Sequence, residues 1–299
     1  MRSAVVTETG DTTLTDLPDP VPTPGQVLVD VEEAGLGHVD VMAARGDYPF
    51  FPGPGAAPGL EVVGRTPDGR RVLALPRFGG CAERVAVDAD RLLPAPDGLD
   101  AIGLGLNALV AELTLHRARV NPGDRVLVRG AGGGIGVLAV QIARARGAQV
   151  TAITSSPARA ARLRALGATT TVDRTDAAPE GEHDVVVDTV AGPGMAEHLP
   201  LLAPNGRYAL CGGVAGDPGP EPFAALLRHF HHSPTLIALS LNSITPDELA
   251  RSWERVRALA DSGALRPVVE RRLPLDRIAE ALRLVGSGRV FGKVVVRAR

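Results

Sequence analysis

The sequence predicts an α/β protein with a parallel sheet covered by helices on both faces, preceded by a β-rich segment. Strand-like and helix-like segments alternate after residue 98, as is typical of a parallel sheet. The strand-like runs at 126–128 and 185–187 are entirely apolar, as burial on both faces requires. Earlier in the chain, short β-rich runs lie between prolines and glycines, which favours a compact β domain with irregular loops.

The elements follow in a definite order. After the β-rich runs comes a helical stretch at 99–119, and a turn at 121–124 ends it. Strands are expected at 27–31, 71–75, 83–87, 125–129, 150–153, 184–188, 207–211, 235–241, 268–273 and 293–296. Further helices are expected at 133–146, 157–166, 194–202, 246–262 and 275–285. The segments after residue 265 are β-rich again, so the composition changes at both borders of the alternating region.

Composition and charge exclude several classes of protein. The chain has 299 residues, of which 44% are hydrophobic and 22% charged, a globular composition. A formal net charge of −2 and an aromatic content of 3% give no basis for binding nucleic acid. Two cysteines form neither a disulfide framework nor a four-cysteine zinc site. No run approaches the roughly 18 apolar residues of a membrane span, so we expect a cytoplasmic protein without membrane partners.

A glycine-rich turn at 130–136 carries the strongest functional signal. Ala131, Gly133 and Gly136 occupy the three positions of the G-x-G-x-x-G motif, with alanine in the first. The second position lets backbone N–H groups approach a pyrophosphate, and the third lets helix and strand pack closely. The helix N-terminus adds free N–H donors and a positive dipole. Because a strand precedes the turn and a helix follows it, we interpret it as a dinucleotide site rather than a plain connection. The cofactor-binding candidates here are Ala131, Gly133, Gly134 and Ile135.

The choice of cofactor is indicated at the end of the second strand. NAD sites place an acidic residue there for the ribose 2′-hydroxyl, but this chain has Thr154 and Ser155 followed by Ser156. Arg159 follows, and Arg174 lies just past the next expected strand. Since arginine pairs well with phosphate, these four candidates favour NADPH. The alternative is that Arg159 is a solvated helix charge.

Several segments in the same order resemble the zinc-independent quinone oxidoreductases of the medium-chain dehydrogenase/reductase superfamily. The likeness extends from Val27 to Val296. Its pieces are 24–29, 34–36, 39–40, 45–49, 58–64, 130–136, 188–190, 203–207 and 291–294. The resemblance implies a GroES-like β-rich catalytic domain, 1–98 plus 265–299, and an inserted Rossmann domain with a doubly wound parallel sheet, 99–264. It also implies a homodimer that pairs through sheet edges near 235–241.

The resemblance assigns further residues to the cofactor. The loop Phe291, Gly292 and Lys293 is expected to touch it, and so are Val190 and Gly212. Asn107 remains as a polar contact near the nicotinamide, where Val110 replaces the threonine that the family commonly has.

No metal is expected. Zinc-dependent relatives have a cysteine where this chain has Gly37 and a histidine where it has Leu60. His38, Asp40 and Glu61 lie nearby, but a catalytic zinc needs three protein ligands and an open position, and these three do not make a convincing set.

Two residues are candidates for the chemistry. Tyr48 lies in a loop rich in glycine and proline and matches a pocket tyrosine of the resembled group; it would donate a hydrogen bond to the carbonyl oxygen that gains charge. The alternative is that it packs the loop. His38 stands where the group has an Asn-Pro pair and could supply a proton, although a lone histidine is more often structural. Another group of histidines, at 229, 231 and 232, is expected at a solvated helix end.

The expected activity is hydride transfer from NADPH to a small-molecule quinone or α,β-unsaturated carbonyl. The link from Gly64 to Arg71 is shorter than is usual in the resembled group and contains a Pro-Asp-Gly turn. Because of this difference, the resemblance does not identify the substrate. One alternative is a biosynthetic enoyl reductase or a cyclase of the same fold. The other is a dinucleotide-binding protein without enzymatic activity.

Overall fold

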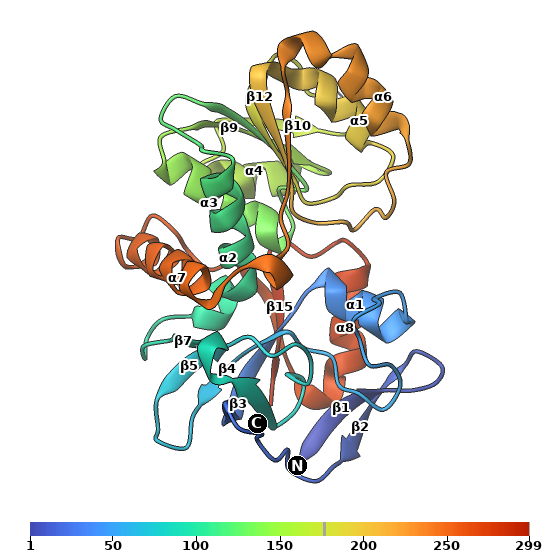
Figure 1. Cartoon of the computed structure of the whole chain (residues 1–299), viewed down its shortest axis with the longest axis vertical. Helices are drawn as coiled ribbons and strands as arrows, with labels where there is room; N and C mark the ends of the chain where they lie inside the picture. Colours follow the sequence, from blue (N-terminus) through green and yellow to red (C-terminus); the bar gives the residue numbers. More distant parts are fainter. Residues whose placement is uncertain (176–177, 299) are drawn as a thin grey trace. The chain divides into compact units, whose positions relative to one another are not determined.

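The computed structural model describes residues 1–175 and 178–298. It divides into two compact units (Figure 1). One comprises Met1–Leu106 and Pro267–Arg299, and the other comprises Asn107–Arg266. Arg299, which ends the expected catalytic segment, lies outside the described residues.

The second unit is built on a six-stranded parallel sheet. Its spatial order is β10-β9-β8-β11-β12-β13, which is the 3-2-1-4-5-6 order of a doubly wound dinucleotide-binding fold. The strands are β8 (Arg125–Arg129), β9 (Gln149–Thr154), β10 (Thr170–Asp173), β11 (His183–Asp188), β12 (Leu202–Leu210) and β13 (Thr235–Ala238). The central strands β8 and β11 are buried almost throughout, because both faces of the sheet are covered.

A helix follows each of these strands except β10 along the chain. Figure 1 shows α3 beside β9 and α5 beside α6, and these pairs are in contact. The helices are α3 (Gly134–Ala145), α4 (Pro157–Ala165), α5 (Met195–His198), α6 (Glu221–Arg228) and α7 (Pro246–Asp261). Local sequence fixes where two of them begin: Ser156 and Thr245 accept hydrogen bonds from the amides of Arg159 and Glu248, and proline follows each cap, as is favourable at a helix start.

The first unit combines both ends of the chain in one sheet. Its order is β14-β15-β3-β4-β5-β7, with β6 also paired to β3. The strands are β3 (Gln26–Leu36), β4 (Glu61–Arg65), β5 (Arg71–Ala74), β6 (Arg84–Asp88), β7 (Leu92–Pro94), β14 (Val269–Pro274) and β15 (Lys293–Arg297). A separate hairpin joins β1 (Arg2–Val6) and β2 (Thr12–Asp16), and α1 (His38–Arg45) contacts α8 (Ile278–Gly286). The C-terminal β15 pairs antiparallel with β3, so residues far apart in sequence form this unit.

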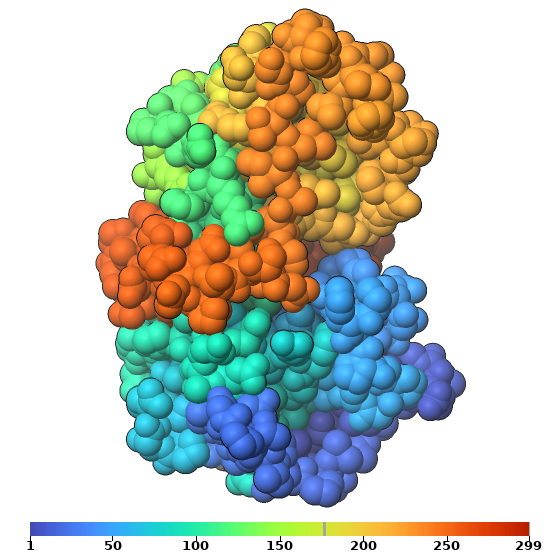
Figure 2. Space-filling model, in the orientation of Figure 1, coloured from blue at the N-terminus to red at the C-terminus, as the bar shows by residue number. Residues whose placement is uncertain are grey.

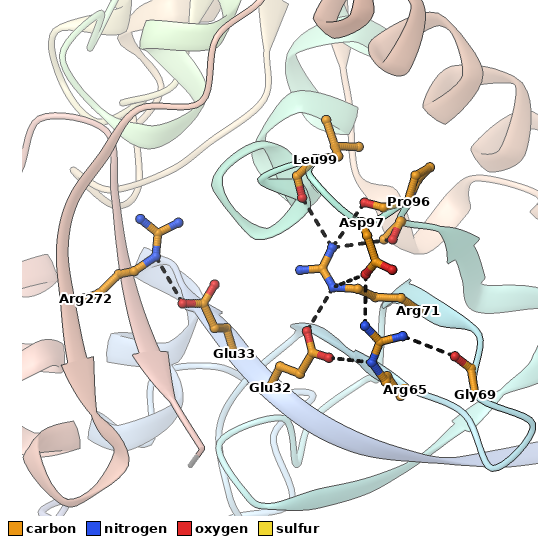
Figure 3. Close-up of polar contacts among 10 residues, drawn as sticks. Glu32, Glu33, Arg65, Gly69, Arg71, Pro96, Asp97, Leu99 and Arg272 are labelled. Carbon is orange, nitrogen blue, oxygen red and sulfur yellow. Dashed lines mark hydrogen bonds and ion pairs between the residues drawn. The ribbon is translucent and has the colours of Figure 1, made fainter.

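A tight turn joins β4 to β5, as the Pro-Asp-Gly signature predicts. Arg65 pairs with Arg71, and Gly69 has a positive φ of 83°. Figure 3 shows how Arg71 ties this hairpin to the chain beyond β7: its guanidinium donates to the carbonyls of Pro96 and Leu99 and pairs with Glu32 at 2.9 Å. These contacts attach the short hairpin to β3 and to the chain after β7.

The structure confirms the α/β class and most expected elements, with informative differences. Helix α2 (Ala101–Arg117) is interrupted at Gly105, whose φ of 44° and ψ of −143° are not helical. The helix expected at 194–202 is only one turn of α-helix and one of 3₁₀-helix, and β12 starts at Leu202 rather than 207. Helix α1 was not among the expected helices, and of α6 only the end near the histidines at 229, 231 and 232 was expected. None of the described helices is long and apolar enough to cross a membrane.

Helix α6 and the turn after it lie at the surface (Figure 2). Phe223, Leu227 and Phe230 are 66%, 58% and 73% exposed. The histidines at 229, 231 and 232 follow the end of α6, where they were expected. Among the described residues, no group of three or more histidine, cysteine, aspartate or glutamate side chains is arranged to hold a metal ion.

Candidate functional site

The glycine turn that joins β8 to α3 is closely packed. Gly130 has a positive φ of 73°, a backbone conformation that glycine adopts most easily. A Cβ at Gly136 would lie 2.3 Å from the Gly130 carbonyl oxygen, which is too close. A Cβ at Gly133 would lie 3.4 Å from the same oxygen, which is an ordinary contact distance. Gly136 is therefore needed for packing, and Gly133 is an open position at the N-cap of α3.

The start of α3 is open to a ligand. Its N-cap, Gly133, has no side chain to accept hydrogen bonds from the first amides. The first N–H groups of a helix have no intrahelical acceptor, so those of Gly134 and Ile135 can receive an anion. Ala131 is completely buried, and its methyl group is too small to obstruct the start of the helix.

The end of β9 gathers the four residues expected at a 2′-phosphate. The Thr154 hydroxyl oxygen is buried and has no hydrogen-bond partner among the described residues. An arginine on α4 reaches the same place, because Arg159 Nη1 donates to Ser155 Oγ at 3.4 Å. The backbone of Arg174 donates to the Thr154 carbonyl at 3.0 Å, and its side chain is exposed. The structure thus brings the end of β9, the start of α4 and the residue after β10 to one place.

Beneath the glycine turn lies a buried polar network that the sequence did not reveal. Asp188, at the end of β11, is completely buried. Its carboxylate accepts hydrogen bonds from the Tyr208 hydroxyl at 2.6 Å and from Arg129 at 3.0 Å. It also accepts the amides of Val190 and Ala191, at 2.7 and 3.1 Å. Since Ala191 has an unfavourable positive φ of 56°, Asp188 holds the loop that carries Val190.

Two other cofactor candidates of this unit lie in crowded positions. A Cβ at Gly212 would lie 2.5 Å from the Thr189 carbonyl oxygen, so only glycine fits there. Asn107 is 8% exposed, which makes its amide a buried polar group.

In the first unit, Tyr48 belongs to an aromatic cluster. Its ring makes edge-to-face contacts with Phe50 and Phe78, at centroid distances of 5.6 and 5.9 Å, and Phe51 packs on Phe78 at 4.9 Å. Four of the nine aromatic side chains in the sequence therefore meet at one place. Phe50 is 69% exposed, while Tyr48 is half-buried.

His38 is the first residue of α1 and is half-buried. Burial lowers the pKa of its imidazole, and the positive charge of Arg45 lowers it further. The neutral form is therefore favoured at neutral pH, and neutral imidazole donates a hydrogen bond more readily than it donates a proton.

The two carboxylates weighed with His38 as zinc ligands, Asp40 and Glu61, are both engaged. Asp40 accepts the amides of Gly37 and Gly59, each at 2.8 Å, and its burial raises its pKa to about 6. Glu61 accepts from Lys293 at 2.5 Å. Gly37 has no side chain that could ligate a metal, and Leu60 likewise has none. These residues do not fit the catalytic zinc site of a dehydrogenase.

The loop from Phe291 to Lys293 leads into β15. Phe291 is 2% exposed, and Gly292 has a positive φ of 88°. Lys293 is also 2% exposed, and its ammonium donates to Glu61 and to the Ile102 carbonyl. The sequence predicts Lys293 as a cofactor contact but does not pair it with Glu61. A signal was present, because a glutamate inside an apolar strand needs a buried partner.

A doubly wound parallel sheet with a glycine turn, together with a separate β-rich sheet, defines a dinucleotide-binding protein of two units. The profile of a family described as zinc-binding dehydrogenase matches residues 166–296. The polyketide synthase GfsB of Streptomyces halstedii is 33% identical over 91% of this chain, although the chain spans only 5% of that protein. The quinone oxidoreductase of Mus musculus is 29% identical over 94% of this chain and 92% of its own length.

Solved structures agree with these matches. The quinone oxidoreductase of Thermus thermophilus, whose complex with NADPH was also solved, is 35% identical with a TM-score of 0.82; the match covers 99% of this chain and 100% of that one. The chain belongs to the medium-chain dehydrogenase/reductase superfamily and is quinone oxidoreductase-like. This membership confirms the resemblance found in the sequence.

Proposed function

We propose that this chain is a zinc-independent reductase that transfers hydride from NADPH to a quinone or an α,β-unsaturated carbonyl compound. The observation that carries the proposal is the arrangement at the carboxyl ends of β8 and β9. There an open helix N-terminus follows Gly133, and the acid-free end of β9 presents Thr154 together with two arginines. This arrangement fits a dinucleotide with an extra phosphate.

Each part of the nucleotide has a proposed partner. The amides of Gly134 and Ile135 would receive the pyrophosphate. The Thr154 and Ser155 hydroxyls and the guanidinium groups of Arg159 and Arg174 would receive the 2′-phosphate. Neighbouring backbone positions at Ala131, Gly133, Val190 and Gly212 would line the nucleotide, and Asn107, Phe291 and Gly292 would contact its nicotinamide part. The solved NADPH complex of the Thermus thermophilus relative supports NADPH as the cofactor.

The bound nicotinamide would supply the hydride, and the protein would contribute position and hydrogen bonds. Tyr48 is the proposed donor to the carbonyl oxygen of the acceptor, because its half-buried ring is held by two phenylalanines. His38 would orient the acceptor through a neutral N–H group, since its lowered pKa disfavours the imidazolium form at neutral pH. In this proposal the final proton comes from water.

A second candidate is supported by the polyketide synthase relatives. GfsB is 33% identical over 91% of this chain, and a mycocerosic acid synthase-like polyketide synthase of Mycolicibacterium smegmatis is 30% identical over 92% of it. The chain spans only 5% and 14% of these two proteins. We therefore propose, as the alternative, an enoyl reductase that acts on the conjugated double bond of a polyketide-type acyl group.

We also propose that the protein is a homodimer paired through β13. This strand is at the edge of the six-stranded sheet and pairs with β12 on one side. Leu236 in this strand is 45% exposed, and Phe223 and Phe230 of the same unit are also exposed. An exposed edge strand with apolar neighbours is a template for pairing with a second chain. Leu236→Lys should convert the dimer to a monomer in light scattering; a monomeric wild type would refute the dimer.

One experiment separates the two activities. NADPH oxidation is followed with a panel of quinones, simple enones and crotonyl thioesters, with Tyr48→Phe as the test variant. Quinone or enone turnover that falls in Tyr48→Phe supports the first candidate, and turnover of the thioester alone supports the second. Absence of turnover across the panel, despite NADPH binding, would refute both and favour a dinucleotide-binding protein without enzymatic activity.

A further inference from the structure

A buried ion pair lies where helix α2 is interrupted. Lys293 Nζ contacts Glu61 Oε1 at 2.5 Å, and the two side chains are 1% and 4% exposed. The other carboxylate oxygen, Oε2, accepts the amide of Leu106 at 2.7 Å. Lys293 also donates to the Ile102 carbonyl at 3.1 Å. The pair therefore holds α2 on both sides of the interruption at Gly105.

The glycines around the carboxylate show that this arrangement is tightly built. A Cβ at Gly105 would lie 1.9 Å from Glu61 Oε2, and a Cβ at Gly35 would lie 2.7 Å from the same carboxylate. Gly105 also has the positive φ of 44° that lets the chain leave the helix. Residues from β3, β4, α2 and β15 thus meet at one carboxylate, and a larger residue at either glycine would displace it.

The position of this cluster in the chain gives it a consequence for function. Leu106 is the last residue of the first unit, and Asn107 is the first residue of the second. Asn107 is the buried amide proposed to contact the nicotinamide. A hydrogen bond to the Leu106 amide therefore fixes the backbone immediately before that contact.

We propose that Glu61 and Lys293 are positioning residues that fix the interruption of α2 and thereby the placement of Asn107. In this account, which rests on the proposed function, Lys293 acts on hydride transfer through Glu61 and does not hold the cofactor. Its ammonium already donates to two acceptors and its side chain is 1% exposed, so a direct contact would have to come from the one remaining N–H group at a buried position.

The test compares the wild type with the double variant Glu61→Met/Lys293→Met, which removes both charges and the acceptor of the Leu106 amide and keeps similar side-chain volumes. NADPH affinity should stay within about threefold, because no direct contact is lost. The turnover number should fall at least about tenfold, since small misplacements of reacting groups have large effects on rate. The kinetic isotope effect with deuterated NADPH should rise, and hydrogen exchange at the Leu106 amide should accelerate at least about tenfold.

Two further variants complete the design. Lys293→Arg keeps the positive charge if the double variant does not fold; its turnover should fall while its NADPH affinity is retained. Arg71→Met is the matched control, because it removes a largely buried cation from the same unit (Figure 3) without touching the cluster. This control should retain wild-type turnover and wild-type exchange at Leu106.

Two results would overturn the proposal. The first is NADPH affinity that falls more than about tenfold with unchanged saturated turnover, which would show that Lys293 binds the cofactor. The second is unchanged turnover and exchange in the double variant. If the wild type shows no turnover, the proposed function fails separately, and unchanged exchange at Leu106 would still overturn the positioning role of the ion pair.

Discussion

The Tyr208 hydroxyl donates a 2.6 Å hydrogen bond to the carboxylate of Asp188, and neither side chain is exposed to solvent. Burial and the negative charge of Asp188 raise the pKa of Tyr208, so it remains a donor at all ordinary pH values. The same carboxylate holds the Val190–Ala191 loop. This relationship links the core of the second unit to a proposed cofactor contact.

Removing either partner should therefore affect stability, but to different extents. Asp188→Asn leaves the charge of Arg129 without its buried partner and should cost about 3–5 kcal/mol of unfolding free energy. Tyr208→Phe removes one hydrogen bond to a charged group and should cost about 1.5–3 kcal/mol. Urea unfolding measures both. Equal losses for the two variants would contradict the assignment of Asp188 as the centre of the network.

Two glycines of the same turn should respond to alanine in different ways, one through stability and the other through cofactor binding. Gly136→Ala places a methyl group against the Gly130 carbonyl and should lower the free energy of unfolding by about 1–3 kcal/mol. Gly133→Ala has room for its methyl group and should leave stability within about 1 kcal/mol. It should still weaken NADPH binding at least about tenfold, because the methyl group blocks approach of the pyrophosphate. Full NADPH affinity in a folded Gly133→Ala variant would place the cofactor elsewhere.

Asp40 should make stability depend on pH. Its folded pKa is raised to about 6 from 3.8 by burial, so the native state binds the proton more tightly than the unfolded chain. The contribution is fully present below about pH 4 and is lost as the pH rises through about 6, a loss of about 3 kcal/mol. Asp40→Asn should lack this fall. Unfolding free energies measured at several pH values check it, and parallel profiles for the two proteins would contradict it.

The fold was predictable from the sequence wherever the pattern of apolar residues by itself identifies the helix or strand that the structure contains. The apolar strands around 126–128 and 185–187 and the glycine turn predict the parallel sheet, because burial on both faces leaves a continuous apolar run. Helix α6 was not predictable in the same way, since Pro220 and Pro222 at its start also favour a turn. The interruption at Gly105 lies against Glu61, a residue of a distant strand, and could not be read from the helical pattern alone.

The candidate site was predictable only where its residues lie close together in the sequence. The cofactor candidates on one strand–turn–helix unit follow from a motif with fixed spacing. Partners such as Lys293 and Glu61 are 232 residues apart in the chain, and no local pattern joins them. Asp188 and Tyr208 belong to neighbouring strands whose register only the folded sheet defines.

The arginines at the end of β9 should discriminate between the two nicotinamide cofactors. Arg174→Ala should weaken NADPH binding about 10- to 100-fold, because a charge-assisted hydrogen bond contributes about 1.5–3 kcal/mol. NADH binding should change by less than about threefold, since NADH lacks the phosphate. Arg164→Ala is the control, because Arg164 lies on α4 and donates to Thr171 instead. An equal loss for both cofactors would refute the phosphate contact.

The most direct test of the account is a fluorescence titration of the wild-type protein with NADPH and with NADH under the same conditions. The acid-free end of β9, with Thr154, Arg159 and Arg174, predicts a dissociation constant at least about tenfold lower for NADPH. Tighter binding of NADH, or binding of neither cofactor, would contradict it.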